Sequence, residues 1–168
     1  KLFKNEFYGP WSYEQHLLGF NFRMNDIQAA LGISQLNRLD QIITERNRLL
    51  NLYKNKLNEL PLKFLNIPED ILSSVHLCVI CIDNCTKNQH KDIFEAIREQ
   101  GIGIQLHYWP VHLNPYYRDL GFKEGDFINA ELYANRALSL PLFPGLKDDD
   151  INNISKILEN TIKRFIDF

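Results

Sequence analysis

Several residue types are scarce in this chain, and each scarcity excludes a class of protein. Three cysteines among 168 residues are too few for a disulfide scaffold, so a reducing cytoplasm is the expected compartment. No apolar run approaches the roughly 20 residues of a membrane-spanning helix, and no Arg-rich leader opens the chain. Lys and Arg (19) nearly balance Asp and Glu (21), which gives no global attraction to nucleic acid or anionic lipid. Met24 is the only methionine, and the chain begins at Lys1, which predicts a piece of a longer protein.

Apolar residues, in contrast, are plentiful. They make up 45% of the chain, enough for the core of one domain or for parts of two. The first 22 residues are rich in aromatic side chains: Phe3, Phe7, Tyr8, Trp11, Tyr13, Phe20 and Phe22. This density favours burial against a partner over a frayed, exposed terminus.

A long helical region is expected from Asn25 to Leu60. Asn25 and Gln28 have the spacing of a capping box, and apolar residues then recur at intervals that fit a 3.6-residue period. Pro61 ends the region. Its length predicts two helices or one kinked helix, with the break between Gly32 and Asp40.

Beyond Pro61 the pattern changes to short strands mixed with helices. The expected strands and extended segments are Leu62–Ile67, Val75–Ile82, Gly103–His107 and Leu140–Phe143. The expected helices run from the cap at Thr86 to Gln100, over Pro115–Leu120 and Phe127–Leu138, and from Asp148 to the C-terminus. This order predicts an α+β domain with a small, largely antiparallel sheet packed by helices.

The cysteines have a spacing that could suggest a metal site. Cys78 and Cys81 form a CxxC pair, with Cys85 four residues further on. However, the pair falls on an expected strand, where side chains three residues apart point to opposite faces. Recruiting His107 and His112 as zinc ligands would need a convergence that the sequence does not indicate. We therefore interpret the cysteines as core residues and expect no metal.

The segment GIGIQLHYWPVHLNPYY, residues 101–117, has the composition of a ligand-binding loop. It places His107, Tyr108, His112 and Tyr117 just past an expected strand, around two prolines that stiffen the loop. Imidazole and phenol groups can hydrogen-bond a hydroxylated ligand near neutral pH. The alternative is that these rings only close one end of the sheet, and spacing alone leaves both interpretations open.

A second candidate lies immediately before the first expected helix. In the sequence GFNFRMND, Asn21 and Arg23 alternate with aromatic residues, so an extended backbone would point both side chains the same way. A guanidinium beside a carboxamide is a suitable site for an anion such as phosphate.

Three blocks of the sequence resemble a known family. In order and spacing, LGFNFRMNDIQAALGISQLNRLD, GIGIQLHYWPVHLNPYYRDLGF and INAELYANRALSLPLFPGL are similar to the C-terminal half of the DegT/DnrJ/EryC1/StrS sugar aminotransferases. The resemblance implies a pyridoxal-phosphate (PLP) enzyme of fold type I. The implied layout is the end of a large domain over 1–24, connecting helices over 25–60 and a small C-terminal α+β domain over 61–168. The SLPL block, residues 139–142, is interpreted as a fold element.

The resemblance also implies a reaction. The second block is most similar to the pseudaminic-acid branch of the family, which implies amination of a UDP-linked 4-keto-6-deoxy-N-acetylhexosamine with glutamate as the amino donor. The family's catalytic lysine and aspartate precede everything in this chain, so no catalytic residue is expected here and the chain alone should be inactive. The alternative is a stand-alone, non-enzymatic module that binds a sugar nucleotide or a partner.

Residue roles follow from the same resemblance. Asn21 matches the family asparagine that reaches the PLP phosphate of a neighbouring subunit, which implies a homodimer with shared active sites. The residues implied to contact the UDP-sugar substrate are Arg23, His107, Tyr108, His112 and Tyr117.

Overall fold

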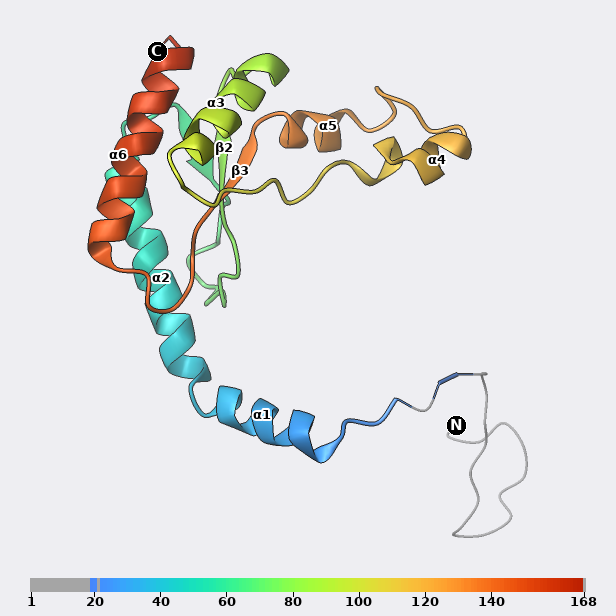
Figure 1. Ribbon diagram of the computed structural model, residues 1–168, viewed down its shortest axis with the longest axis vertical. Coiled ribbons are helices and arrows are strands. Elements are labelled where there is room, and N and C mark those ends of the chain that lie inside the picture. Colours follow the sequence, from blue (N-terminus) through green and yellow to red (C-terminus); the bar gives the residue numbers. More distant parts are fainter. Residues whose placement is uncertain (1–18, 21, 168) are drawn as a thin grey trace. The chain divides into compact units, whose positions relative to one another are not determined.

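The computed structural model describes residues 19, 20 and 22–167, and it divides the chain into two compact units. The first unit is Lys1–Asn37 and the second is Arg38–Phe168. Each is considered by itself (Figure 1). Asn21 lies outside the described residues, as does most of the aromatic-rich opening.

The described part of the first unit contains one helix, α1 (Asp26–Leu36). Its N-terminus forms the expected capping box. The backbone N–H of Gln28 donates to the Asn25 side chain at 2.9 Å, and the side-chain oxygen Oε1 of Gln28 accepts from the backbone N–H of Asn25 at 3.0 Å. These bonds satisfy two N–H groups that have no partner inside the helix. No residue of α1 is buried.

The second unit opens with α2 (Leu39–Lys56). Asn37 and Arg38 separate it from α1, which confirms the predicted break between two helices. α2 buries Leu49, Leu50 and Tyr53, and the Tyr53 hydroxyl donates to the carbonyl of Pro141 at 3.1 Å. The phenol thus contributes both apolar area and a satisfied polar end to the core.

A three-stranded antiparallel sheet follows, in the order β1-β2-β3. Its strands are β1 (Leu62–Phe64), β2 (Cys78–Ile82) and β3 (Ala137–Leu140). β2 lies in the centre, with Lys63 opposite Cys81 on one side and Leu138 opposite Ile80 on the other. The fold is therefore α+β with a short antiparallel sheet, as predicted.

Several sequence-based boundaries were wrong, and the strand expected from Val75 begins only at Cys78. Gly103–His107 is not a strand: only Gln105 pairs, in an isolated bridge to Ser139. The helix expected over Phe127–Leu138 is α5 (Ile128–Ala134), which ends before β3 begins. β3 is fully buried, so pairing with β2 outweighs the helical preference of its Ala-Leu sequence. β1 ends at Phe64 rather than at Ile67.

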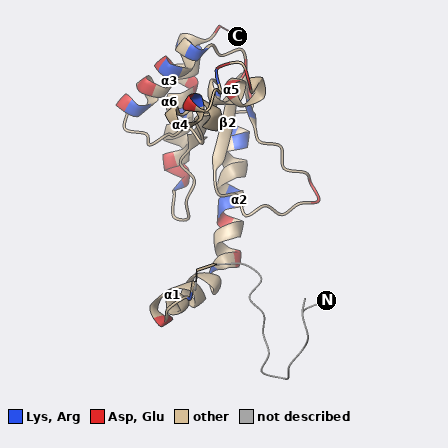
Figure 2. Cartoon of the chain, turned by 90° about the vertical axis from the view of Figure 1, so that its right-hand side faces the viewer, with Lys and Arg blue, Asp and Glu red and all other residues tan. Residues whose placement is uncertain are grey.

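The core is covered by α2, α3 (Lys87–Glu99) and α6 (Asp148–Phe165). α6 packs against both of the other helices (Figure 1). Its apolar stripe includes Ile151, Leu158 and Ile162, each at most 1% exposed. In Figure 2, positions of Lys or Arg and of Asp or Glu are coloured along these helices, as expected for helices with a solvated outer face. Among residues 19, 20 and 22–167, no helix has the length and hydropathy that a membrane crossing requires.

Residues 106–134 form an extension that we call the arm. It leaves the sheet after the Gln105 bridge and returns to β3 (Figure 1). Its elements are a 3₁₀ turn (Val111–Leu113), α4 (Pro115–Asp119) and α5. The arm carries four of the predicted site residues.

Candidate functional site

The structure places the predicted arm residues in two groups: His107 contacts Tyr108, and His112 and Tyr117 line one pocket. His107, Tyr108, His112 and Tyr117 all lie in the arm. Arg23 lies in the first unit, on the exposed backbone that precedes α1. Asn21 is outside the described residues, so its predicted contact with a cofactor phosphate stays a prediction.

His107 is held in place from two directions. Its Nδ1 lies 2.8 Å from the hydroxyl of Ser139 on β3, and its carbonyl accepts a 2.9 Å hydrogen bond from the Tyr133 hydroxyl on α5. Burial raises the pKa of Tyr133, with a further contribution from Cys81, so the phenol remains a donor at neutral pH. Sequence reasoning missed Ser139, because SLPL was interpreted as a fold element only.

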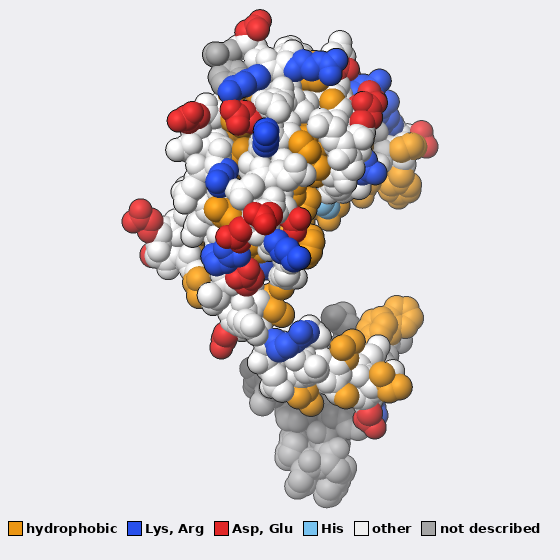
Figure 3. Space-filling view, turned by 60° about the vertical axis from the view of Figure 1, so that its left-hand side comes forward, with side chains coloured by type: hydrophobic (Ala, Val, Ile, Leu, Met, Phe, Trp, Pro, Cys, Tyr) orange, Lys and Arg blue, Asp and Glu red, His pale blue; other side chains and the backbone are white. Residues whose placement is uncertain are grey.

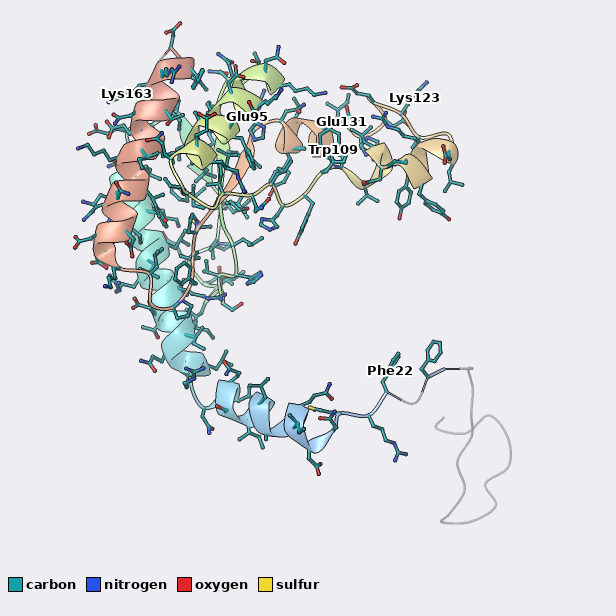
Figure 4. The ribbon with its side chains drawn as sticks, in the orientation of Figure 1. Phe22, Glu95, Trp109, Lys123, Glu131 and Lys163 are labelled. Atoms are coloured by element: carbon teal, nitrogen blue, oxygen red, sulfur yellow. The ribbon has the colours of Figure 1, made fainter. Side chains whose placement is uncertain are left out.

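Tyr108 and Tyr117 present aromatic surface to solvent. Tyr108 is 72% exposed, and its ring meets the His107 ring edge-on with centroids 4.7 Å apart. The Tyr117 ring packs edge-on against Tyr116 at 5.3 Å. Figure 4 shows Trp109 projecting from the same stretch of the arm. Exposed phenol hydroxyls can donate hydrogen bonds to phosphate or sugar oxygens, and that of Tyr108 lies on a ring packed against the anchored imidazole.

His112 has a different environment from His107. It is only 7% exposed, and its Nε2 lies 2.8 Å from the Glu131 carboxylate. Glu131 also accepts hydrogen bonds from the backbone N–H of Gly125 at 2.9 and 3.0 Å and of Phe127 at 3.4 Å. One carboxylate on α5 thus ties the 3₁₀ turn and the loop before α5 together (Figure 4).

The pKa of Glu131 reflects these contacts. Burial acts to raise the pKa of its carboxyl, but the hydrogen bonds from His112, Gly125 and Phe127 lower it, and the net pKa lies below the usual value. The Nε2 of His112 is engaged by this carboxylate, so the arrangement shown makes His112 a support of the arm. A substrate contact by His112 stays a prediction.

An apolar pocket of about 360 Å³ opens on the arm. Its lining residues are Val111, His112, Tyr117, Phe122, Phe127 and Ala130. The Phe127 ring packs against His112 at 4.8 Å and against Phe122 at 6.0 Å, so the walls are largely aromatic. Figure 3 shows further hydrophobic side chains, in orange, reaching the surface of the molecule.

The cysteines lie in and beside the sheet. Cys78 and Cys85 are buried and Cys81 is partly exposed, and all three are free thiols. Burial raises the pKa of Cys78 to about 12, which keeps the thiol neutral and unreactive. Within the described ranges, no three His, Cys, Asp or Glu side chains are grouped to hold a metal ion.

Comparisons with known proteins agree with this fold. A model of the DegT/DnrJ/EryC1/StrS aminotransferase family matches residues 6–159. The spore coat polysaccharide biosynthesis protein SpsC of Bacillus subtilis is 35% identical over 159 residues, which are 92% of this chain and 41% of SpsC. The chain thus spans about two fifths of the length of this relative.

Two solved structures show the same architecture. The Spr1654 protein of Streptococcus pneumoniae in its PMP form superposes with a TM-score of 0.84 at 24% identity, covering 93% of this chain and 39% of that one. Helicobacter pylori PseC, described as an aminotransferase involved in the biosynthesis of pseudoaminic acid, gives a TM-score of 0.80 at 28% identity. That match covers 94% of this chain and 42% of PseC.

Proposed function

Because the chain belongs to the DegT/DnrJ/EryC1/StrS aminotransferase family, we propose that it forms part of an enzyme that aminates a nucleotide-linked keto-sugar. The observation that carries the proposal is the family match over residues 6–159. Aminotransferases of this family depend on PLP. The layout proposed for the chain is the end of a large domain over 1–24, connecting helices over 25–60 and a small domain over 61–168.

The proposed substrate is a UDP-linked 4-keto-6-deoxy-N-acetylhexosamine, with glutamate as the amino donor. Two observations support it: the resemblance of the block from Gln105 to Phe127 to the pseudaminic-acid branch, and the structural match to PseC. The proposed assembly is a homodimer with shared active sites, in which Asn21 reaches the neighbour's PLP phosphate. The proposed compartment is the cytoplasm, which the three free thiols support.

Within that enzyme, we assign the arm to the substrate. His107 is anchored through Nδ1, so its Nε2 is the nitrogen offered to a ligand. Tyr108 and Tyr117 add phenol hydroxyls on exposed rings, whereas Arg23, in the other unit, is proposed to reach the phosphate of the neighbouring subunit's substrate. These groups bind and orient the substrate, and none of them is proposed to take part in covalent chemistry.

We propose that the described residues do not by themselves hold the cofactor. PLP supplies an aldehyde that is held by a lysine amine and carries the amino group between substrates. The arm pocket is lined by aromatic and aliphatic side chains and by no lysine. We therefore derive no step through PLP and propose that this chain alone does not transaminate.

The experiment that tests the proposal is a titration of the chain with UDP, followed by ¹H–¹⁵N spectra and calorimetry. His107→Ala should weaken UDP binding by about threefold to tenfold, the effect of one lost hydrogen bond to a charged ligand. The control is His76→Ala, which removes an exposed histidine outside the arm. Unchanged affinity in His107→Ala would contradict the assignment of the arm to the substrate.

A second measurement tests the proposed inactivity. The chain is incubated with PLP, reduced with borohydride and weighed by mass spectrometry. We expect only sub-stoichiometric labelling of surface lysines. A stoichiometric adduct on one lysine would show that the chain does carry a cofactor site, and the division of roles proposed above would be wrong.

A further inference from the structure

We propose that Ser139 is a positioning residue: its hydroxyl donates a hydrogen bond to Nδ1 of His107, so that the imidazole presents Nε2–H to the ligand. The identity of that ligand rests on the function proposed above. The direction of the hydrogen bond and the immobilisation of the ring do not.

The geometry that carries this inference joins the arm to the centre of the fold. Ser139 is the third residue of β3 and is only 4% exposed. Opposite it on β2 lies Val79, and on its other side the backbones of Gln105 and Ser139 exchange two hydrogen bonds, at 2.7 and 3.2 Å. The strand on which the hydroxyl sits is therefore held on both sides.

His107 lies two residues after Gln105, the bridge residue. Its side chain reaches back to the Ser139 hydroxyl at 2.8 Å, while its carbonyl accepts from Tyr133 at 2.9 Å. The ring and the backbone carbonyl of His107 are thus fixed by two separate contacts, one to β3 and one to α5. A side chain held this way loses its rotamer freedom during folding rather than during ligand binding, which lowers the entropic cost of binding.

The buried environment decides which atom donates. Within the part of the chain that the structure describes, Nδ1 of His107 is the hydrogen-bond partner of the Ser139 hydroxyl. A buried hydroxyl proton needs an acceptor, and a neutral imidazole nitrogen without a proton is one. If Ser139 donates to Nδ1, the ring proton resides on Nε2. Nε2 then carries an N–H that can donate a hydrogen bond to a phosphate or sugar carbonyl oxygen.

The chain provides a matched control for this serine. Ser155 on α6 is 5% exposed, and its hydroxyl has no hydrogen-bond partner among the described residues. Ser139→Ala and Ser155→Ala therefore each delete one buried serine hydroxyl, but only Ser139→Ala removes a hydrogen bond to His107. Ser139→Thr keeps the hydroxyl on a residue that suits a strand and serves as the rescue variant.

The first test is nitrogen NMR of the His107 ring at a pH where imidazole is neutral, with ¹³C relaxation of the same ring. The unmodified chain should carry the proton on Nε2 and show a ring as rigid as its backbone. Ser139→Ala should shift the Nδ1 resonance and mobilise the ring, whereas Ser155→Ala and Ser139→Thr should leave both unchanged. A proton on Nδ1 in the unmodified chain would overturn the proposal, and this result needs no variant to fold.

The second test separates this proposal from the proposed function by measuring UDP affinity. We expect Ser139→Ala to weaken UDP binding about threefold, less than His107→Ala, because the imidazole remains but is no longer held. If His107→Ala weakens binding and Ser139→Ala changes neither the ring nor the affinity, the positioning role is refuted while the function stands. If Ser139→Ala frees the ring but neither variant changes UDP affinity, the positioning role stands and the function is refuted.

Discussion

Helices α1 and α6 begin in similar ways but differ in burial. In α1 the backbone N–H of Asn25 donates to Gln28, and at the start of α6 the backbone N–H of Lys147 donates to Asp150. α6 nevertheless buries six residues and α1 buries none. The comparison teaches that local sequence decides where a helix starts, whereas its contribution to stability depends on what packs against it.

The apolar residues of α1 are distributed differently from those of α6. Ile27, Leu31 and Leu36 are between 60% and 82% exposed. In α6, Ile151, Ile154, Leu158 and Ile162 recur at intervals of three and four and lie on one face. α6 therefore has a defined core side, while the contribution of α1 to the stability of this chain should be small.

The largest expected effect on stability comes from truncating one leucine side chain to alanine in each helix. Leu158→Ala removes a side chain that is 1% exposed and should cost about 2–5 kcal/mol of unfolding free energy through lost burial and a cavity. Leu31→Ala, at a site 60% exposed, should cost less than about 0.5 kcal/mol. Urea unfolding followed by circular dichroism measures both. Equal losses in the two variants would break the comparison and show that α1 is packed.

The next expected effect concerns the capping boxes of α1, at Asn25, and of α3, at Thr86. Thr86 caps α3, where Gln89 also donates to the Phe165 carbonyl at 2.8 Å and so links α3 to α6. Thr86→Ala should lower the global stability by about 1 kcal/mol. Asn25→Ala removes the equivalent cap from α1 and should fray that helix without moving the global urea midpoint.

Hydrogen exchange resolves the two capping variants. Amides of the first turn of α1 should exchange faster in Asn25→Ala, while amides of β2 keep their protection. If Asn25→Ala instead lowered the protection of β2, then α1 and the sheet would unfold together, and the two regions could not be treated as separate in stability.

Sequence reasoning predicted the fold best where local signals act alone. The boxes at Asn25 and Thr86 were found because they need only residues three positions apart. The start of β3 was missed because Ala137 and Leu138 have helical preference, and only pairing with β2 makes them a strand. The strand expected over residues 103–107 was an over-prediction, because its local sequence favours a strand but only Gln105 pairs with a neighbouring strand.

The candidate site was predictable in part. The sequence identified the aromatic and histidine-rich stretch from His107 to Tyr117, but it could not distinguish a His107 anchored by a serine from a His112 paired with a carboxylate. That distinction depends on Ser139 and Glu131, which are 32 and 19 residues away along the chain. Partners this far apart in the sequence produce no local motif from which their contact could be predicted.

The arm is intermediate between α1 and α6, because it is held by polar contacts as well as apolar ones. The Glu131 carboxyl has a pKa below its usual value, so its contribution is complete above the unfolded-state pKa, about 4.3, and is lost as the pH falls through the lower folded value. The Gly125 amide, which donates to Glu131, should lose its protection from exchange over that acidic range. Glu131→Gln should abolish this pH dependence, and β2 amides should not show it.

Glu124→Gln is the control for the arm. Glu124 lies in the same loop and is exposed, with Lys87 3.9 Å away. Its replacement should leave the exchange of the Gly125 amide unchanged at every pH. If Glu124→Gln and Glu131→Gln altered that amide equally, the effect would arise from the net charge of the loop rather than from the specific hydrogen bonds of Glu131.

The smallest expected effect tests whether charges rather than apolar burial distinguish α6. Arg48 on α2 bonds Glu45 at 2.9 Å and Asp148, the first residue of α6, at 2.8 Å. All three side chains are largely solvent-accessible, so water and salt screen the attraction and its contribution is small. Arg48→Gln should lower the urea midpoint slightly at low salt and not at all at high salt, whereas Lys56→Gln on the same helix should change neither. A loss that persists at high salt would mean that Arg48 stabilises α6 through packing of its aliphatic stem, and that the advantage of α6 over α1 is not due to its buried stripe alone.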